Sequence, residues 1–264
     1  MIDTHCHLSF PQLRQQLDAV IGRAREAGVD RLITVGTKPD DSAIARDIAA
    51  AHDGVYFTAG VHPHYAAEIA TDQLVGMAEL ARHPRCVALG EMGLDYHYPD
   101  PPPEDQRDLF EAQLVGAALF ETALPVVIHC RKAVDDTLAI LRASGMALNR
   151  FVFHCFTETA ADARKVLDAG CMISFTGIVT YANAPEVRES AKVVPAERIM
   201  VETDSPYLSP EPHRKVRPNE PRMAVAVAKF LAELRGVAAA DFIAQCDANA
   251  ERFYHIPFTA FRAG

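Results

Sequence analysis

This chain of 264 residues lacks the sequence features that mark several common classes of protein. It has no run of 18 or more apolar residues, so we expect no membrane span. Its first residues show no basic stretch followed by an apolar one, so we expect no secretory signal and a cytoplasmic location. Tryptophan is absent as well, which decides nothing about fold or function.

Closely spaced cysteine pairs are also missing. The six cysteines are scattered and none forms a Cys-x-x-Cys pair, which argues against a zinc ribbon or a dithiol redox site. Five of them lie in or beside apolar strand-like segments, so we expect buried free thiols. Because side chains alternate across a strand, Cys130 and Cys155 should face away from their neighbours His129 and His154, under the helices.

Positive charge is in deficit. The chain has 26 Lys and Arg residues against 35 Asp and Glu, which gives a net charge of −9 and a pI of about 5.6. This balance argues against an extended basic surface of the kind that grips duplex nucleic acid non-specifically. It does not exclude a nucleic-acid substrate.

Strand-like and helix-like segments alternate along the whole chain, as expected for βαβ units around a parallel sheet. Helical patterns fill the gaps between eight strand-like segments and continue after the last one. The pattern predicts a (β/α)8 TIM barrel, with a doubly wound open sheet as the alternative. We find no internal repeat or composition break, and we expect residues 1–264 to form one domain. The expected strands are 1–5, 31–36, 55–61, 86–91, 126–129, 151–154, 172–175 and 199–202.

Side chains of the kinds that bind metals lie at or just after the C-terminal ends of five of these strands. In a TIM barrel the C-terminal ends of the strands meet at one face, where active sites form. The set contains four histidines and two carboxylates, which is about what two adjacent divalent cations need. The sequence therefore indicates a metallohydrolase. The candidate ligands are His5, His7, Glu91, His129, His154 and Asp204.

The residue types and positions suggest which candidate ligands bind each of the two ions. His5 and His7 are two residues apart on an extended segment, so both can reach one ion. His129 and His154 end consecutive strands and are better explained as ligands to a second ion than as isolated core histidines. A carboxylate can offer one oxygen to each metal, so Glu91 is the expected bridge.

Two acidic residues near the end of the last strand are the candidate proton acceptors. Asp204 precedes a Ser-Pro pair and read alone is also an ordinary turn former. As a ligand hydrogen-bonded to the attacking water, Asp204 can orient that water and take its proton. Glu202 either shares this duty or supports the ligands from outside the site.

Six short motifs, in this order, resemble those of the TatD family of metal-dependent hydrolases. Together they cover nearly the whole chain, and the combination is far more specific than any single motif. They are DTHCHL at 3–8, GVHP at 60–63, GEMGLDY at 90–96, VIHCR at 127–131, FHCFT at 153–157 and ETDSPYL at 202–208.

The resemblance implies a TIM-barrel enzyme of the wider amidohydrolase group, with two metals and with deoxyribonuclease activity. It implies that His5, His7 and Asp204 hold one metal, that His129 and His154 hold the other, and that Glu91 bridges them. Many related amidohydrolases use a carboxylated lysine as the bridge, so the glutamate sets this chain apart.

The resemblance also places His62 and Arg131 near the substrate, where each can hold a phosphate oxygen. The plain alternatives are a loop histidine and an exposed arginine. Arg214 is a third candidate for phosphate contact, but its segment departs from the family. Members often have a compact Arg-Gly-Lys element before Asn-Glu-Pro, whereas residues 212–221 read PHRKVRPNEP, without the glycine and one residue longer.

We therefore expect a metal-dependent phosphodiesterase, an exonuclease acting on the ends of single-stranded DNA with a hydroxide activated by two metals. The occupied site would be positive, because two divalent cations outweigh the two anionic ligands Glu91 and Asp204. The cations are Zn²⁺, Mn²⁺, Mg²⁺ or Ni²⁺. The alternative is an amidohydrolase-type esterase, lactonase or aminoacyl-ester deacylase. The oligomeric state stays open, and a monomer is compatible with this interpretation.

Overall fold

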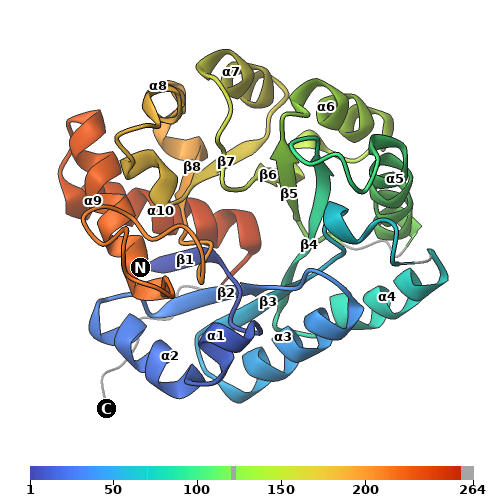
Figure 1. Ribbon diagram of the computed structural model, residues 1–264, viewed down its shortest axis with the longest axis horizontal. Helices are drawn as coiled ribbons and strands as arrows, with labels where there is room; N and C mark the ends of the chain where they lie inside the picture. Colours follow the sequence, from blue (N-terminus) through green and yellow to red (C-terminus); the bar gives the residue numbers. More distant parts are fainter. Residues whose placement is uncertain (70, 120–122, 257–264) are drawn as a thin grey trace.

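Eight parallel strands form a barrel surrounded by helices (Figure 1). The computed structural model describes residues 1–69, 71–119 and 123–256. The strands pair in sequence order from β1 to β8, and a bridge between Cys6 and Ser205 joins β1 to the segment after β8. The predicted TIM barrel is confirmed, and the open doubly wound sheet is excluded by this strand order.

The strands are β1 (Ile2–Cys6), β2 (Arg31–Val35), β3 (Val55–Ala59), β4 (Cys86–Asp95), β5 (Val126–Arg131), β6 (Phe151–Phe153), β7 (Met172–Phe175) and β8 (Ile199–Val201). The α-helices are α1 (Pro11–Arg14), α2 (Leu17–Glu26), α3 (Pro39–Ala51), α4 (Val75–Ala81), α5 (Pro103–Leu119), α6 (Val134–Ala143), α7 (Ala160–Asp168), α8 (Pro185–Val193), α9 (Ala224–Arg235) and α10 (Ala239–Tyr254). Short 3-10 helices are η1 (Pro63–Tyr65), η2 (Thr71–Leu74), η3 (Leu148–Arg150), η4 (Gly177–Thr180), η5 (Ala196–Arg198) and η6 (Pro221–Met223).

Several element bounds differ from the sequence-based expectation. The helical pattern between the first two strands forms two helices, α1 and α2, because Gln16 leaves the helical conformation with φ −134° and ψ 36°. The fourth strand, expected to end at Glu91, continues to Asp95, where it still pairs with β5. This extension brings Asp95 to the same end of the barrel as the candidate ligands.

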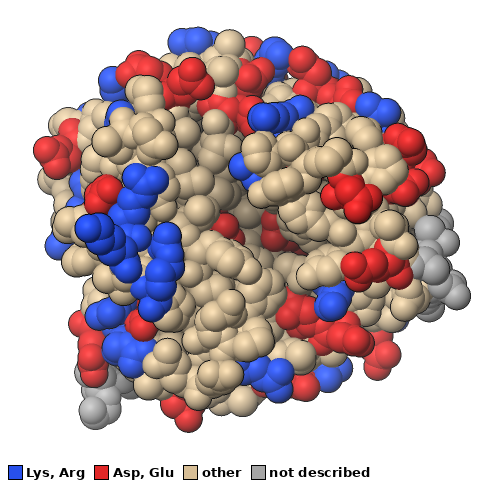
Figure 2. All heavy atoms as spheres, in the orientation of Figure 1, with Lys and Arg blue, Asp and Glu red and all other residues tan. Residues whose placement is uncertain are grey.

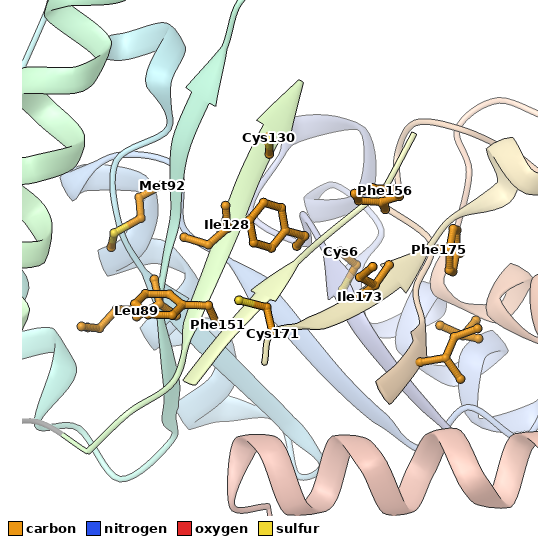
Figure 3. Close-up of a cluster of buried hydrophobic side chains, with 14 of the residues drawn as sticks. Cys6, Leu89, Met92, Ile128, Cys130, Phe151, Phe156, Cys171, Ile173 and Phe175 are labelled. Carbon is orange, nitrogen blue, oxygen red and sulfur yellow. The ribbon is translucent and has the colours of Figure 1, made fainter. Parts of the chain in front are cut away.

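The outer faces of the strands pack against the helices and form the larger core (Figure 3). Ile128, Phe151 and Ile173 from consecutive strands belong to it and are fully buried. Full burial of one such side chain contributes about 1.5–3 kcal/mol. Cys130 lies in the same layer, and its thiol contacts the Thr137 hydroxyl of α6 at 3.5 Å, as the alternation predicts.

The inner faces form a second cluster at the N-terminal end of the barrel, and α10 closes it from below. Val127, Val152 and Met200 belong to this cluster together with Phe253 and Tyr254 of α10. In Figure 1 α10 lies behind the barrel, on the side away from the viewer. The barrel is therefore packed with apolar side chains at one end, which leaves the C-terminal ends of the strands as the place for a site.

Candidate metal centre

The candidate ligands lie one layer above the inner apolar cluster. His129, His154 and Glu202 each follow an inward-facing core residue by two positions. Because strand side chains repeat every two residues, the continued inner face points them into the barrel mouth. The same alternation of side chains that buries the inner core therefore also directs these ligands into the barrel mouth.

Glu91 lies at the centre of the cluster and is only 3% exposed. Its Oε1 atom is 2.7 Å from Nε2 of His154 and 2.8 Å from Nδ1 of His129. Its Oε2 atom is 3.5 Å from Nε2 of His5. Each carboxylate oxygen therefore faces a different group of histidines, which is the arrangement that a bridging ligand needs.

Glycines on either side of Glu91 make this placement possible. Gly90 has φ 109°, and a Cβ atom there would lie 2.5 Å from the Val127 carbonyl oxygen. Gly93 has φ 143°, and a Cβ atom there would lie 2.0 Å from the His129 carbonyl oxygen. A side chain at either position would push β4 away from β5 and move Glu91 from the histidines.

His5, His7 and Asp204 form the first ligand group, with ligand atoms within 4.8 Å of one another. Oδ1 of Asp204 is 3.1 Å from Nε2 of His7 and 3.6 Å from Nε2 of His5. The buried Asp3 supports this group, because it accepts hydrogen bonds from the backbone and hydroxyl of Thr203 at 2.9 and 2.6 Å. Asp3 thereby ties the end of β8 to β1.

His129 and His154 form the second group around Glu91, and a further carboxylate holds each ring from outside. Nε2 of His129 is 3.1 Å from Oδ2 of Asp95, and Nδ1 of His154 is 3.4 Å from Oε1 of Glu202. When Nε2 of His129 donates to Asp95, Nδ1 of the same ring keeps a lone pair that can bind a metal. Nδ1 of His154 faces the charge of Glu202 without a hydrogen bond to any residue that the structure describes.

Glu202 is held in place by three hydrogen bonds. Its oxygens accept from the Cys155 backbone at 2.6 Å, the Ser174 hydroxyl at 2.7 Å and the Thr4 hydroxyl at 3.3 Å. It is 1% exposed, whereas Asp204 lines the cavity. The geometry favours Asp204 over Glu202 as a proton acceptor and favours Glu202 as the residue that orients His154.

The charges in the cluster shift the pKa values of its members. Burial alone would raise the pKa of Glu91, but His154 and the other facing imidazoles hold it well below its usual range. Burial would lower the pKa of His154, but Glu91 and Glu202 raise it well above the usual value. In the same way, His129 and His64 lower the pKa of Asp95 despite its burial. These carboxylates are therefore anionic at neutral pH.

His62 belongs to a third group with Glu91 and His129, but its hydrogen bonds do not suit a metal ligand. The His64 backbone N–H donates to its Nδ1 atom at 3.1 Å, so Nδ1 carries a lone pair. The proton of the neutral ring is then on Nε2, which points toward His129 and Glu91 at 3.2 and 3.5 Å. His62 therefore presents an N–H donor to the site.

The donor set fits divalent cations. Nε2 of His5 is completely buried, and neither it nor Nδ1 of His7 has a hydrogen-bond partner among the described residues. A buried polar atom without a partner destabilises the fold. A cation bound to Nε2 of His5 would give this atom a partner and remove that cost. Imidazole nitrogens together with carboxylate oxygens suit Zn²⁺, Mn²⁺ or Ni²⁺ better than Mg²⁺.

The cluster opens into a cavity of about 660 Å³ at the centre of the hollow in Figure 2. This volume is typical of small-molecule and cofactor sites. Arg131 lines it, with its guanidinium 5.5 Å from the centre of the Tyr98 ring. Tyr98 and Tyr207 also line it and are about half exposed, at 49% and 48%. Of the three predicted substrate-binding residues, His62 and Arg131 thus lie in the cavity.

Arg214 lies outside this cavity, on the loop after β8. Its guanidinium carbon lies 4.0 Å from the centre of the Tyr181 ring. One expectation about the cysteines is wrong, because Cys155 is partly exposed and lines the cavity. The physical reason is that β6 ends at Phe153 and Cys155 has φ 43°, so strand alternation no longer applies to it.

Two site residues were missed by sequence reasoning. Asp95 and His64 are joined by a 3.1 Å hydrogen bond, and Asp95 also holds His129. A signal for Asp95 was present, because it lies four residues after Glu91 in an extended segment and therefore on the same strand face. The expected strand stopped at Glu91, four residues short of Asp95.

A closed barrel with clustered imidazoles and carboxylates at the C-terminal ends of its strands defines the class of TIM-barrel metal-dependent hydrolases. Comparison with known proteins gives the family. The protein-family model described as TatD related DNase matches residues 2–255 of this chain. The chain therefore belongs to the TatD family.

Several relatives cover almost the same length. The uncharacterized metal-dependent hydrolase YcfH of Escherichia coli strain K12 is 38% identical over 97% of this chain and 96% of its own. The protein named 3'-5' ssDNA/RNA exonuclease TatD of Erwinia billingiae is also 38% identical, over 97% of this chain and all of its own. The crystal structure of YJJV, a TatD homologue from Escherichia coli K12, superposes with a TM-score of 0.90 at 30% identity, covering 97% of this chain and 98% of that one. The chain is thus a TatD-family metal-dependent hydrolase.

Proposed function

We propose that this hydrolase holds two divalent cations bridged by Glu91 and removes nucleotides from the ends of single-stranded DNA. The observation that carries the proposal is the position of Glu91, whose two carboxylate oxygens face different histidine groups within one cavity. His5, His7 and Asp204 would hold one cation, and His129 and His154 the other. Glu91 would neutralise part of the charge of both.

In this proposal different residues activate the water, bind the phosphate and orient His154. When bound, the cations would make hydroxide available near neutral pH and polarise the phosphoryl oxygen. Asp204 accepts the proton of the attacking water, since it lines the cavity beside His7. Arg131 and the Nε2–H of His62 hold non-bridging phosphate oxygens, because both donors face the cavity. Glu202 orients His154.

The relatives support this choice of substrate. Several proteins that match nearly the full chain, including the Erwinia protein above, are named 3'-5' ssDNA/RNA exonucleases. We therefore propose that digestion begins at the 3′ end and that RNA is accepted as well as DNA. Residues 1–264 act as one domain in this proposal.

The six free cysteines support a reducing compartment such as the cytoplasm as the place of action. None of the described helices combines the length and apolar character that crossing a membrane requires.

The direct test is to strip the protein of metal, reload it separately with Mg²⁺, Mn²⁺, Zn²⁺ and Ni²⁺, and measure cleavage of end-labelled DNA. We expect single-stranded DNA to be shortened from its 3′ end, and duplex DNA to be cut more slowly. Aryl esters, lactones and aminoacyl esters are assayed in parallel. Turnover of one of these carbon esters with no DNA cleavage under any metal would replace the phosphodiesterase by the alternative chemistry.

Glu91→Gln tests the bridge itself. The amide offers a single neutral acceptor oxygen, so we expect the bound metal to fall from two ions per chain to one. Activity should fall by more than the roughly 10- to 100-fold typical of losing an outer partner of a ligand. Metal content is measured by elemental analysis, with the exposed Glu68→Gln as the control. Two retained ions and full activity would show that Glu91 is not the bridge.

A further inference from the structure

The loop between β8 and α9 carries a group of cations beside the cavity mouth. Arg214, Lys215 and Arg217 lie within four positions of one another, and Lys215 and Arg217 are exposed. Figure 2 shows basic side chains gathered at this side of the central hollow, over the segment drawn in orange in Figure 1. In a chain of net charge −9, this is a local reversal of sign.

Ordered contacts fix the loop in place. The Arg214 guanidinium lies over the Tyr181 ring, and the Tyr181 hydroxyl donates to the Ser209 carbonyl oxygen at 3.1 Å. Arg217 donates to the Ser209 hydroxyl at 3.0 Å. The cations are therefore held on a packed segment, so binding an anion there costs less conformational entropy than on a free loop.

The opposite rim has the reverse charge. Residues 99–108, which begin after Tyr98, contain four carboxylates and only one cation, Arg107. That cation is paired with Asp136 of α6. In Figure 2 red side chains predominate on this side of the hollow. A polyanion crossing this rim would meet repulsion, whereas one crossing the β8–α9 loop would meet attraction.

An exposed aromatic ring lies at the boundary between the cavity and the basic loop. Tyr207 is 48% exposed and lines the cavity, and Phe10 supports it with ring centres 6.2 Å apart. Proteins that bind single strands combine a basic path along the backbone with aromatic rings on which bases stack. Tyr207 and the loop provide these two parts side by side.

We propose that the body of a single-stranded substrate leaves the cavity over Tyr207 and across the β8–α9 loop, with its phosphates on Lys215 and Arg217. The terminal nucleotide then lies at the opposite end of the cavity, beside Arg131 and Tyr98. The inference rests on the proposed exonuclease function and adds a direction to it. The path uses residues 212–221, which lack the Arg-Gly-Lys element that the family resemblance implies.

The path predicts that the basic loop matters for long substrates and not for short ones. The measurement is kcat/KM for a 12-nucleotide single strand and for a dinucleotide, each at several salt concentrations. In the double variant Lys215→Gln/Arg217→Gln, the ratio of the long to the short substrate should fall about tenfold. The slope of log kcat/KM against log salt should flatten by about 1.4 for the long strand, because each lost phosphate contact contributes about 0.7.

Arg82→Gln is the matched control. Arg82 is exposed at the end of α4, on the opposite face of the barrel, and its loss removes a cation without touching the path. The control should leave the ratio and the salt slope as in the unaltered protein. An unchanged ratio in the double variant, with DNA cleavage intact, would overturn the path and leave the nuclease function standing. If the unaltered protein cleaves neither substrate, the proposed function itself fails.

Discussion

At the scale of single residues, the site depends on atoms that face away from the cavity as much as on those that face it. Asp95 contacts Nε2 of His129, while Nδ1 of the same ring faces Glu91. A ring between two carboxylates can direct only one lone pair inward, and the outer partner decides which nitrogen carries it. Asp95 therefore acts on the site through His129, beside which it also lines the cavity.

Asp95→Asn tests this positioning role. The side-chain amide can turn its NH2 group toward Nε2 of His129, which would favour the proton on Nδ1 and remove the inward lone pair. We expect the affinity for divalent metal to fall about 10- to 100-fold. Isothermal titration calorimetry of the metal-stripped protein measures it.

The exposed Asp100→Asn, on the following loop, is the control for this experiment. Asparagine keeps an acceptor for the His97 backbone N–H, which donates to Oδ1 of Asp95 at 2.9 Å. The melting temperature of the metal-free variant should nevertheless fall, because the substitution removes the negative charge that pairs with His129 and His64. An unchanged metal affinity would show that Asp95 does not position His129.

Most of the site residues could be predicted, because the C-terminal ends of all barrel strands lie at one face. All six candidate ligands could be identified from side-chain type and strand position, and the structure brings all six together. The role of His62 could not be identified in this way, since its tautomer depends on a backbone N–H two residues later. Such a contact depends on loop dihedral angles that no side-chain pattern records.

At the scale of elements, the short helix η4 supports the loop that follows β8. A Cβ atom on Gly177 would lie 2.1 Å from the Leu208 carbonyl oxygen and 2.9 Å from the nitrogen of Pro210. The backbones of the two segments are therefore in direct contact. No flexible side chain separates them, so the loop cannot adapt to added volume without moving.

Gly177→Ala should therefore move the loop that carries Asp204 and Tyr207. We expect a loss of about 1–3 kcal/mol in the free energy of unfolding, as for other overpacked sites, together with reduced activity. Urea denaturation and DNA cleavage measure the two effects.

Gly22→Ala provides the contrast, because an added Cβ atom at this position within α2 has nothing within 4 Å. That variant should gain about 0.5–1 kcal/mol from the higher helix propensity of alanine. Equal stability changes in the two variants would contradict the tight contact between η4 and the loop.

Element boundaries were less predictable than element types. The fourth strand was expected to end at Glu91, yet the glycines on either side of this residue let β4 continue to Asp95 at close range to β5. Local propensity treats glycine as a breaker, whereas here the neighbouring backbone requires it. The course of residues 205–221 was equally hidden, because contacts with η4 and Tyr181 set it.

At the scale of the whole molecule, binding of metal should be coupled to release of protons. Burial would lower the pKa values of His7 and His129, but Asp204 raises the first and Asp95 and Glu91 raise the second. The pKa of His154 is raised more strongly. These rings therefore hold protons to higher pH in the metal-free protein than free histidine does, and a cation must displace them.

Apparent metal affinity should consequently fall as the pH is lowered from 8 to 6. The sign follows because the protonated rings predominate at the lower pH and cannot donate a lone pair. Calorimetric titrations in buffers of different ionisation enthalpy count the protons released. At least one proton per bound pair of cations is expected near pH 7, and affinity independent of pH would contradict the raised pKa values.

The net charge alone did not predict how charge is distributed over the surface. A net charge of −9 correctly argued against a broad basic surface, but it is an average over a molecule whose two rims differ in sign. The barrel brings residues 99–108 and 211–217 to opposite sides of one opening. Only the closed circular order of the strands places them so.

The seam between β1 and the end of β8 has a consequence for the synthesis of the protein. His7 and Asp204 are separated by 197 positions in the chain, and the Asp3–Thr203 contact beside them spans 200. A nascent chain therefore displays His5 and His7 long before their partner carboxylate has been made. The first group of candidate ligands is completed only once Asp204 has been made, so a ribosome-bound fragment that ends before this residue lacks one of the carboxylates of the site.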